Sequence, residues 1–122
     1  MRAVFIAFFA TWSATAFCAP GDEARHTAGV IEGCRLVAQG KVGQTRLDGM
    51  QWGVCLGALQ ALGIISSHLQ PNMRSCVPSD ASTEQVAKVF LKYADQHPER
   101  HNDGIEILAV EAFKAGWPCK AK

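Results

Sequence analysis

The sequence predicts an all-α protein, a compact bundle of four main helices fastened by disulfides. Apolar residues recur at steps of three and four in four separate stretches, the spacing that places them on one face of a helix. Gly, Pro and polar residues divide these stretches. Hydrophobic residues make up 48% and charged residues 19% of the 122 positions, which is typical of one globular domain with its own core.

The first residues are typical of an export signal. A short positive start is followed at residues 3–17 by an uncharged, mostly apolar run, and Ala14-Thr15-Ala16 offers a small-residue cleavage site. The position of the cut stays open, with the bonds after Cys18 and after Gly21 as alternatives. We expect residues 1–19 to be a signal peptide and residues 22–122 to form a helical domain. Once the leader is removed, we expect this domain to have no membrane contact.

The first helix of the domain is predicted at residues 23–39. Asp22 can cap its start and Gly40 suits its exit. Its apolar stripe includes Cys34.

The second helix is predicted at residues 49–69, with Asp48 as its cap. It is apolar over most of its circumference between Gly53 and Ile65, so we expect a central helix that its neighbours bury. Its apolar core is too short for a membrane span. A stripe of small residues at four-residue steps should let another helix approach closely: Gly53, Gly57 and Ala61.

The third helix has the clearest boundaries. Ser82 and Gln85 have the spacing of a capping box, in which each side chain satisfies a backbone donor near the helix start. An apolar stripe then continues to His97, where Pro98 disfavours helical geometry and ends the helix.

A fourth helix completes a hairpin with the third. Asn102 or Asp103 can cap it, and its apolar stripe lies within residues 105–113. Gly116 and Pro118 end it.

Four cysteines remain if Cys18 is lost with the leader: Cys34, Cys55, Cys76 and Cys119. An even number in a small exported chain predicts two disulfides, for which three pairings are possible. The close C-x-x-C spacing that structural zinc sites and redox enzymes favour does not occur. We therefore predict no metal site and no cofactor.

Charge and side-chain chemistry indicate a non-catalytic protein. The formal net charge of +1 lacks the basic excess of a nucleic-acid binder, so we expect no nucleic-acid partner. Ser67 and His68 are adjacent, but helix neighbours point about 100° apart and are not thereby a catalytic pair. Glu106 and Glu111 are expected to face solvent. No phosphate-binding glycine loop or paired-carboxylate signature occurs.

The chain carries six short motifs in order: Cys55-Leu56-Gly57, Cys76-Val77-Pro78, Gln85-Val86, Lys92-Tyr93, His97-Pro98-Glu99 and Trp117-Pro118-Cys119. Together they resemble the Rap/Tai family, the periplasmic immunity proteins of type VI secretion systems. The resemblance covers residues 33–119. It implies an all-helical domain, often a homodimer, that is similar to small periplasmic acid-stress chaperones. It also implies that the domain neutralises a toxin, typically a peptidoglycan amidase, by plugging its active-site cleft.

The resemblance to the chaperones implies the pairing of the cysteines. It favours a disulfide between Cys55 and Cys76, with Cys34–Cys119 as the second. The chain departs from the family at Ala58 and at Ser75, where aromatic residues are usual.

The link between the third and fourth helices is the predicted partner-binding site. Pro98 stiffens it and two packed helices hold it, so little conformational freedom would be lost on docking. The resemblance points to the same segment, because a helix-connecting loop enters the toxin's cleft in members of this family. The alternative is an ordinary solvated turn. The residues predicted to contact the partner are His97, Glu99, Arg100, His101 and Asn102.

Two functional hypotheses follow. The first is a periplasmic immunity protein that binds and blocks a cognate effector, a type VI secretion toxin that the resemblance suggests is a cell-wall amidase. The second is a general periplasmic helical binding protein, or an acid-stress chaperone-like protein, with no dedicated toxin. Met50 and Trp52 form a second candidate surface, which either serves a homodimer or lies in the core.

Overall fold

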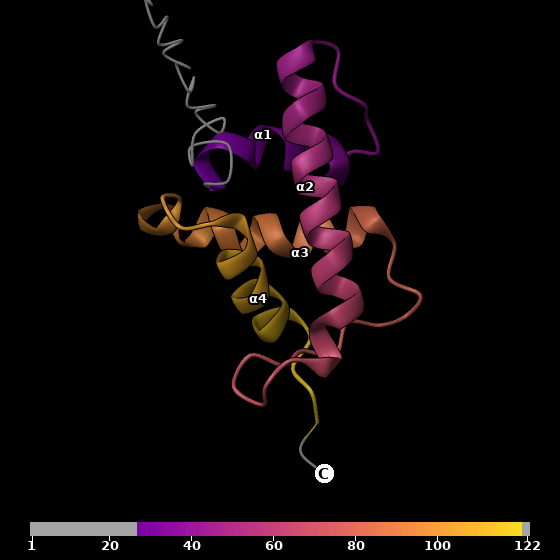
Figure 1. Cartoon of the computed structure of the whole chain (residues 1–122), viewed down its shortest axis with the longest axis vertical. Coiled ribbons are helices and arrows are strands. Elements are labelled where there is room, and N and C mark those ends of the chain that lie inside the picture. The colour runs from indigo at the N-terminus through magenta and orange to yellow at the C-terminus, as the bar shows by residue number, and fades with distance from the viewer. Residues whose placement is uncertain (1–26, 121–122) are drawn as a thin grey trace, which may run out of the picture.

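The computed structural model describes residues 27–120. These residues form four α-helices, two short 3-10 turns and no strand, which confirms the all-α prediction (Figure 1). The predicted signal peptide and the Asp22 cap lie outside the described residues. The elements are α1 (Thr27–Ala38), α2 (Arg46–Ile65), η2 (Ser66–His68), α3 (Thr83–Gln96), η3 (Pro98–Arg100) and α4 (Ile105–Gly116).

The core lies where the four helices meet. Figure 1 shows α2 crossing both α1 and α3, while α4 packs against α3 and α2. Every helix contributes side chains that are fully or almost fully buried, so the bundle closes around a single apolar cluster. These include Val30 and Cys34 from α1, Cys55 and Leu59 from α2, Phe90 from α3, and Ile105, Leu108 and Phe113 from α4.

Helix α1 ends as predicted. Gly40 has a φ of +66°, in the left-handed region that glycine adopts without steric cost. The Gly40 and Lys41 amides donate to the carbonyls of Val37 and Leu36, at 3.0 and 2.9 Å, which satisfies the end of the helix.

Helix α2 begins three residues before the predicted start, so the assignment of Asp48 as its cap is wrong. Thr45 is the N-cap: its hydroxyl accepts from the Asp48 amide, and the Asp48 carboxylate accepts from the Thr45 amide, both at 3.1 Å. Asp48 is therefore the third helical residue of a capping box. An acidic side chain is favourable there too, because it faces the positive end of the helix dipole.

The expectation that neighbours bury α2 is also wrong. Within α2 only Cys55 and Leu59 are buried. Gly53 and Gly57 face open space, since a Cβ built on either would meet nothing within 4 Å. Residues 46–68 are long and apolar enough, by length and composition alone, to cross a membrane, and 17% of the 18-residue window that meets this criterion is buried inside the protein.

The hairpin of α3 and α4 follows most of its predicted boundaries. The capping box at Ser82 and Gln85 is present, with bonds of 2.9 and 3.2 Å. Helix α3 ends at Gln96, just before His97 and Pro98, and α4 ends at Gly116. The predicted cap of α4 is wrong: Gly104 occupies the N-cap without a side-chain bond.

The structure pairs Cys34 with Cys55 and Cys76 with Cys119, so the pairing implied by the resemblance is wrong. Two disulfides are present, as the count predicted. Helices α1 and α2 touch at Gly33, where an added Cβ would lie 2.2 Å from the backbone of Gln51. Cys34 follows Gly33, and Cys55 lies one turn beyond Gln51. The close crossing therefore brings these two buried sulfurs together.

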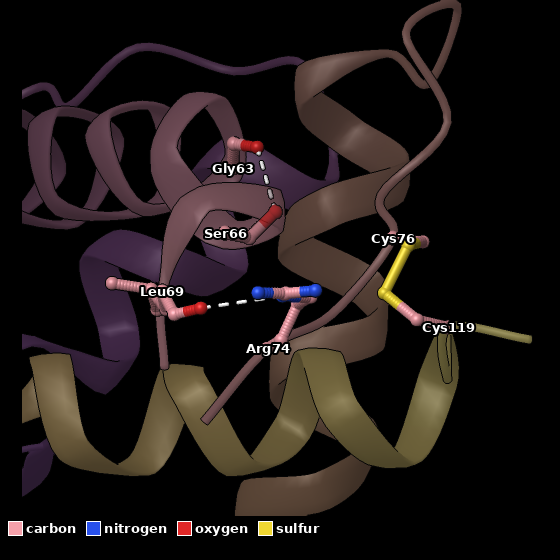
Figure 2. Close-up of a disulfide and its surroundings, with 6 residues drawn as sticks. All are labelled: Gly63, Ser66, Leu69, Arg74, Cys76 and Cys119. Atoms are coloured by element: carbon pink, nitrogen blue, oxygen red, sulfur yellow. Dashed lines mark hydrogen bonds between the residues drawn. A yellow bond between two sulfur atoms is a disulfide. The ribbon is translucent and has the colours of Figure 1, made fainter. Parts of the chain in front are cut away.

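The second disulfide, Cys76–Cys119, joins the segment before α3 to the segment after α4. The Cys76 amide donates to the Trp117 carbonyl at 2.8 Å, which holds the two segments side by side. Figure 2 shows this disulfide close to the turn after α2, where the Arg74 guanidinium donates to the Leu69 carbonyl at 3.2 Å. The Ser66 hydroxyl in that turn donates to the Gly63 carbonyl at 3.0 Å.

Candidate partner-binding loop

The predicted partner-binding residues lie in the segment between α3 and α4, called here the 97–103 loop. Its backbone turns on itself: the Arg100 amide donates to the His97 carbonyl at 3.0 Å, and the Asp103 amide donates to the Arg100 carbonyl at 2.9 Å. The His101 amide donates to the Pro98 carbonyl at 3.3 Å. These bonds include those of the short 3-10 turn η3 (Pro98–Arg100) and give the loop a defined shape.

The start of α1 holds one side of the loop. The Thr27 amide donates to the Asp103 carbonyl at 3.0 Å, and the Ala28 amide donates to the His101 carbonyl at 2.9 Å. The first amides of a helix have no partner within the helix, so α1 supplies donors that the loop carbonyls accept. Thr27 is fully buried in this contact.

Arg100 holds the other side through two carboxylates. Its Nε donates to Asp103 Oδ2 at 2.9 Å, and its Nη1 donates to Glu111 Oε2 on α4. The same Glu111 oxygen accepts from the Tyr93 hydroxyl on α3 at 3.0 Å. Glu111 therefore joins α3, α4 and the loop, and the expectation that it simply faces solvent is wrong. Figure 1 shows the loop at the end of the hairpin, where α3 passes into α4.

The pKa values in this cluster shift as an ion pair requires. Hydrogen bonds to Glu111 and then to Asp103 raise the pKa of the Arg100 guanidinium. The hydrogen bond from Arg100 lowers the pKa of the Glu111 carboxyl, although partial desolvation opposes this. Desolvation, followed by the bond to Glu111, raises the pKa of the Tyr93 hydroxyl. Arg100 and Glu111 are therefore both charged at neutral pH, and Tyr93 keeps its proton.

His101 also points into the protein. Its Nε2 lies 2.9 Å from the carbonyl oxygen of Ala94 in the last turn of α3. A carbonyl can only accept, so Nε2 carries the proton in this contact. The imidazole thus adds a second hydrogen bond to a carbonyl in the last turn of α3, which also accepts from the His97 amide at 3.1 Å.

The remaining predicted residues are more open. The side chains of His97 and Glu99 are 37% and 65% exposed, and Asn102 is exposed. His97 Nδ1 lies 3.2 Å from Glu99 Oε1, and the His97 ring packs 4.3 Å from the ring of Tyr93. Hydrogen bonding to its own backbone amide, and then to His97, lowers the pKa of the Glu99 carboxyl. The five predicted contacts therefore divide into three exposed side chains and two that bond within the protein.

The sequence reasoning missed the residues that support the loop: Tyr93, Asp103, Glu111 and Thr27. The spacing of Arg100 and Asp103 was a usable signal, because opposite charges three residues apart often pair in a turn or helix. The contact between Arg100 and Glu111 had no such signal, since it depends on how α4 packs against α3.

A second surface lies on α2, called here the α2 outer face: Leu47, Met50, Gly53, Gly57, Ala61 and Ile64. Its large side chains are half or more exposed, with Ile64 at 77%. Trp52, the other half of the second candidate surface, instead packs against the core. A half-open groove of ≈ 610 Å³ borders this face between the end of α2 and the segment around Val77 and Pro78.

Other groups in the described residues have structural partners. The Ser66 hydroxyl is buried and bonded to the Gly63 carbonyl. Within residues 27–120, no three His, Cys, Asp or Glu side chains gather closely enough to hold a metal ion. In the same part of the chain, every buried side-chain nitrogen and oxygen atom has a hydrogen-bond partner.

One protein-family model, described as Rap1a immunity proteins, matches residues 26–119. The match spans all four helices, both disulfides and the 97–103 loop. Comparison with curated proteins gave no match, and neither did comparison with solved structures.

Proposed function

Because the chain belongs to the Rap1a immunity protein family, and so protects against a secreted toxin, we propose that it acts in the periplasm as an inhibitor without catalytic activity. It binds one type VI secretion toxin and blocks it. The predicted signal peptide at residues 1–19 would deliver it there. Two disulfides in a small domain suit an oxidising compartment of this kind.

The fixed shape of the 97–103 loop is the observation that supports this mechanism best. Hydrogen bonds from α1 hold it on one side and the Arg100 ion pairs on the other. A loop that is ordered before binding loses little conformational freedom when it docks. Its exposed side chains, His97, Glu99 and Asn102, are the proposed contacts with the toxin.

We propose further that the toxin is a peptidoglycan amidase and that the loop enters its active-site cleft. A loop of fixed shape with exposed polar side chains suits a cleft that accepts a polar peptide substrate. Blocking of this kind needs no chemistry from the inhibitor.

A binding experiment tests the proposal. Residues 22–122 are produced by periplasmic export and mixed with the purified products of neighbouring reading frames that encode cell-wall hydrolases. We expect one of them to be retained and its hydrolysis of peptidoglycan to be inhibited. The triple variant His97→Ala, Glu99→Ala, Asn102→Ala should bind at least tenfold more weakly.

The matched control is Lys88→Ala with Lys92→Ala, which truncates exposed side chains on α3 outside the loop. This control should bind as tightly as the wild type. Equal affinities for the triple variant and the wild type would remove the loop from the interface. Retention of none of the hydrolases would remove the immunity mechanism itself.

The α2 outer face supports a homodimer. A twofold axis at Gly57 would place Met50 of one protomer against Ile64 of the other, and Gly53 against Ala61. The exposed apolar side chains would then be covered, and the glycines would let the helices approach closely. Light scattering should give the mass of a dimer for the wild type and of a monomer for Gly57→Arg, with Lys88→Glu as control. A wild type that remains monomeric at a protein concentration on the order of 100 micromolar would contradict the dimer.

The same exposed face is the specific observation that favours the second candidate function, a general binding or acid-stress chaperone role. An apolar surface without charge can hold unfolded clients. This function predicts that the wild type, but not Gly57→Arg, slows the aggregation of an acid-unfolded client protein. If neither does so while a toxin is bound tightly at neutral pH, the chaperone role is rejected.

A further inference from the structure

Arg100 looks like a contact residue in the sequence but bonds entirely within the protein. Its guanidinium joins Asp103 in the loop to Glu111 on α4, and its side chain is 28% exposed. Arginine suits this position because its planar group presents several donors in a fixed arrangement. Its hydrogen bonds to carboxylates are therefore both made inside the protein, to Asp103 and Glu111.

We propose that Arg100 is a positioning residue, which acts through Glu111 to hold the 97–103 loop in its binding shape and does not itself contact the toxin. This inference rests on the proposed function. The toxin contacts then come from His97, Glu99 and Asn102 alone.

The geometry explains why Glu111 is the anchor. It lies on α4, accepts from Arg100 in the loop, and accepts from Tyr93 on α3 at 3.0 Å. Tyr93 also packs against the ring of His97 at 4.3 Å. The Glu111 carboxylate thus connects α3 and α4, which flank the loop, with Arg100 in the middle of the loop. Through Tyr93 it is also linked to His97, one of the proposed toxin contacts.

The two sides of the loop differ in how they can fail. The bonds from α1 are made by the backbone amides of Thr27 and Ala28, together with the Thr27 hydroxyl, which donates to the Asp103 carbonyl at 3.3 Å, and substitutions at Arg100 or Glu111 remove none of these groups. The Arg100 side depends on side chains alone. Glu111→Gln should therefore release the loop from α4 at Arg100, while the helices, the bonds to α1 and the contact of His101 with the Ala94 carbonyl remain.

Amide hydrogen exchange in the free protein is the first test. The amides of Arg100, His101 and Asp103, which form the loop turns, should exchange at least tenfold faster in Glu111→Gln than in the wild type. Helicity by circular dichroism should be unchanged. Arg35→Gln is the matched control, because it breaks another exposed ion pair, to Asp95, and should leave loop exchange unchanged.

Toxin binding is the second test, arranged as a double-mutant cycle. The probe is the hydrolase that the wild type retains in the experiment above. If Arg100 acts through Glu111, then Arg100→Gln, Glu111→Gln and the double variant should all bind about tenfold more weakly than the wild type, with no further loss in the double variant. Tyr93→Phe, which keeps the ring and removes the hydroxyl, should lose less.

The outcomes separate the two proposals. Unchanged loop exchange in Glu111→Gln overturns the positioning role, whether or not any toxin binds. Losses that add in the double variant also overturn it, because they show that Arg100 contributes to binding independently of Glu111. Faster exchange together with no binding by the wild type would instead contradict the proposed function and leave the loop's anchoring intact.

Discussion

Glu111 is the residue on which the polar contacts of the candidate site converge. It takes a hydrogen bond from Arg100 and another from Tyr93. Its side chain is still 38% exposed, so solvent screens the pair and limits what it contributes to overall stability. Its main role is to hold the loop in position, and the ionisation of its carboxyl makes the contribution of the ion pair measurable.

We predict that this signature is a pH dependence of stability. Arg100 lowers the folded-state pKa of Glu111 below its ordinary value of 4.5. The pair therefore stabilises the fold above that value, and this contribution is lost as the pH falls through the lower, folded-state pKa. Urea unfolding should show wild type and Glu111→Gln converging as the pH is lowered from about 5 to about 3.

The control for this measurement is Glu106→Gln, which removes an exposed carboxylate from the same helix. A difference between wild type and Glu111→Gln that stays constant across this pH range would show that the ion pair does not contribute as described.

At the scale of elements, the crossing of α1 and α2 decides the position of both helices. Gly33 on α1 is buried against the backbone of Gln51, whereas Gly57 on α2 faces open space. Glycine is therefore required in one helix by a neighbouring backbone and is simply a poor helix former in the other. The two residues make a matched pair for measuring this difference.

We predict opposite effects of alanine at these two positions. Gly33→Ala should destabilise the protein by about 2 kcal/mol or more, because the methyl group would overlap the backbone of α2 and neither helix can yield cheaply. Gly57→Ala should stabilise the monomer by up to about 1 kcal/mol through helix propensity. Urea unfolding at a concentration where the protein is monomeric measures both. Equal effects of the two substitutions would contradict the observed crossing.

At the scale of the whole molecule, the disulfides divide the chain into two closed parts. Cys34–Cys55 joins α1 to α2, and Cys76–Cys119 encloses α3, the 97–103 loop and α4. The candidate site therefore lies inside the second covalent ring. Loop closure in the unfolded chain gives about 3 kcal/mol for the first disulfide and about 4 kcal/mol for the second.

We predict that the second disulfide is reduced first. Cys76 is exposed, whereas Cys34 and Cys55 are fully buried, so a reductant reaches the second bridge without unfolding the core. Brief reduction, alkylation and mass spectrometry should label Cys76 and Cys119 before the other two. Simultaneous labelling of all four cysteines would contradict this order. Peptide mapping without reduction should find the same two pairs.

The local features of the fold were predictable from neighbouring residues. Ser82 with Gln85 marked the start of α3, Pro98 marked its end, and Gly40 marked the end of α1. Each depends on hydrogen bonds or sterics within a few residues. The start of α2 was misplaced because the prediction makes Asp48 the cap itself, although Thr45 and Asp48 have the spacing of a capping box, a local signal that the sequence does contain.

The sequence by itself determined that this protein is helical, where most of its helices end, that two disulfides form and which segment links the last two helices. These properties follow from spacing, capping and cysteine number. Only the tertiary structure decided which cysteines pair, which side of α2 stays exposed, and that Arg100 and His101 bond inward to Glu111 and Ala94. The physical reason is that these contacts join elements distant in the chain, and their partners are chosen by the way the helices cross.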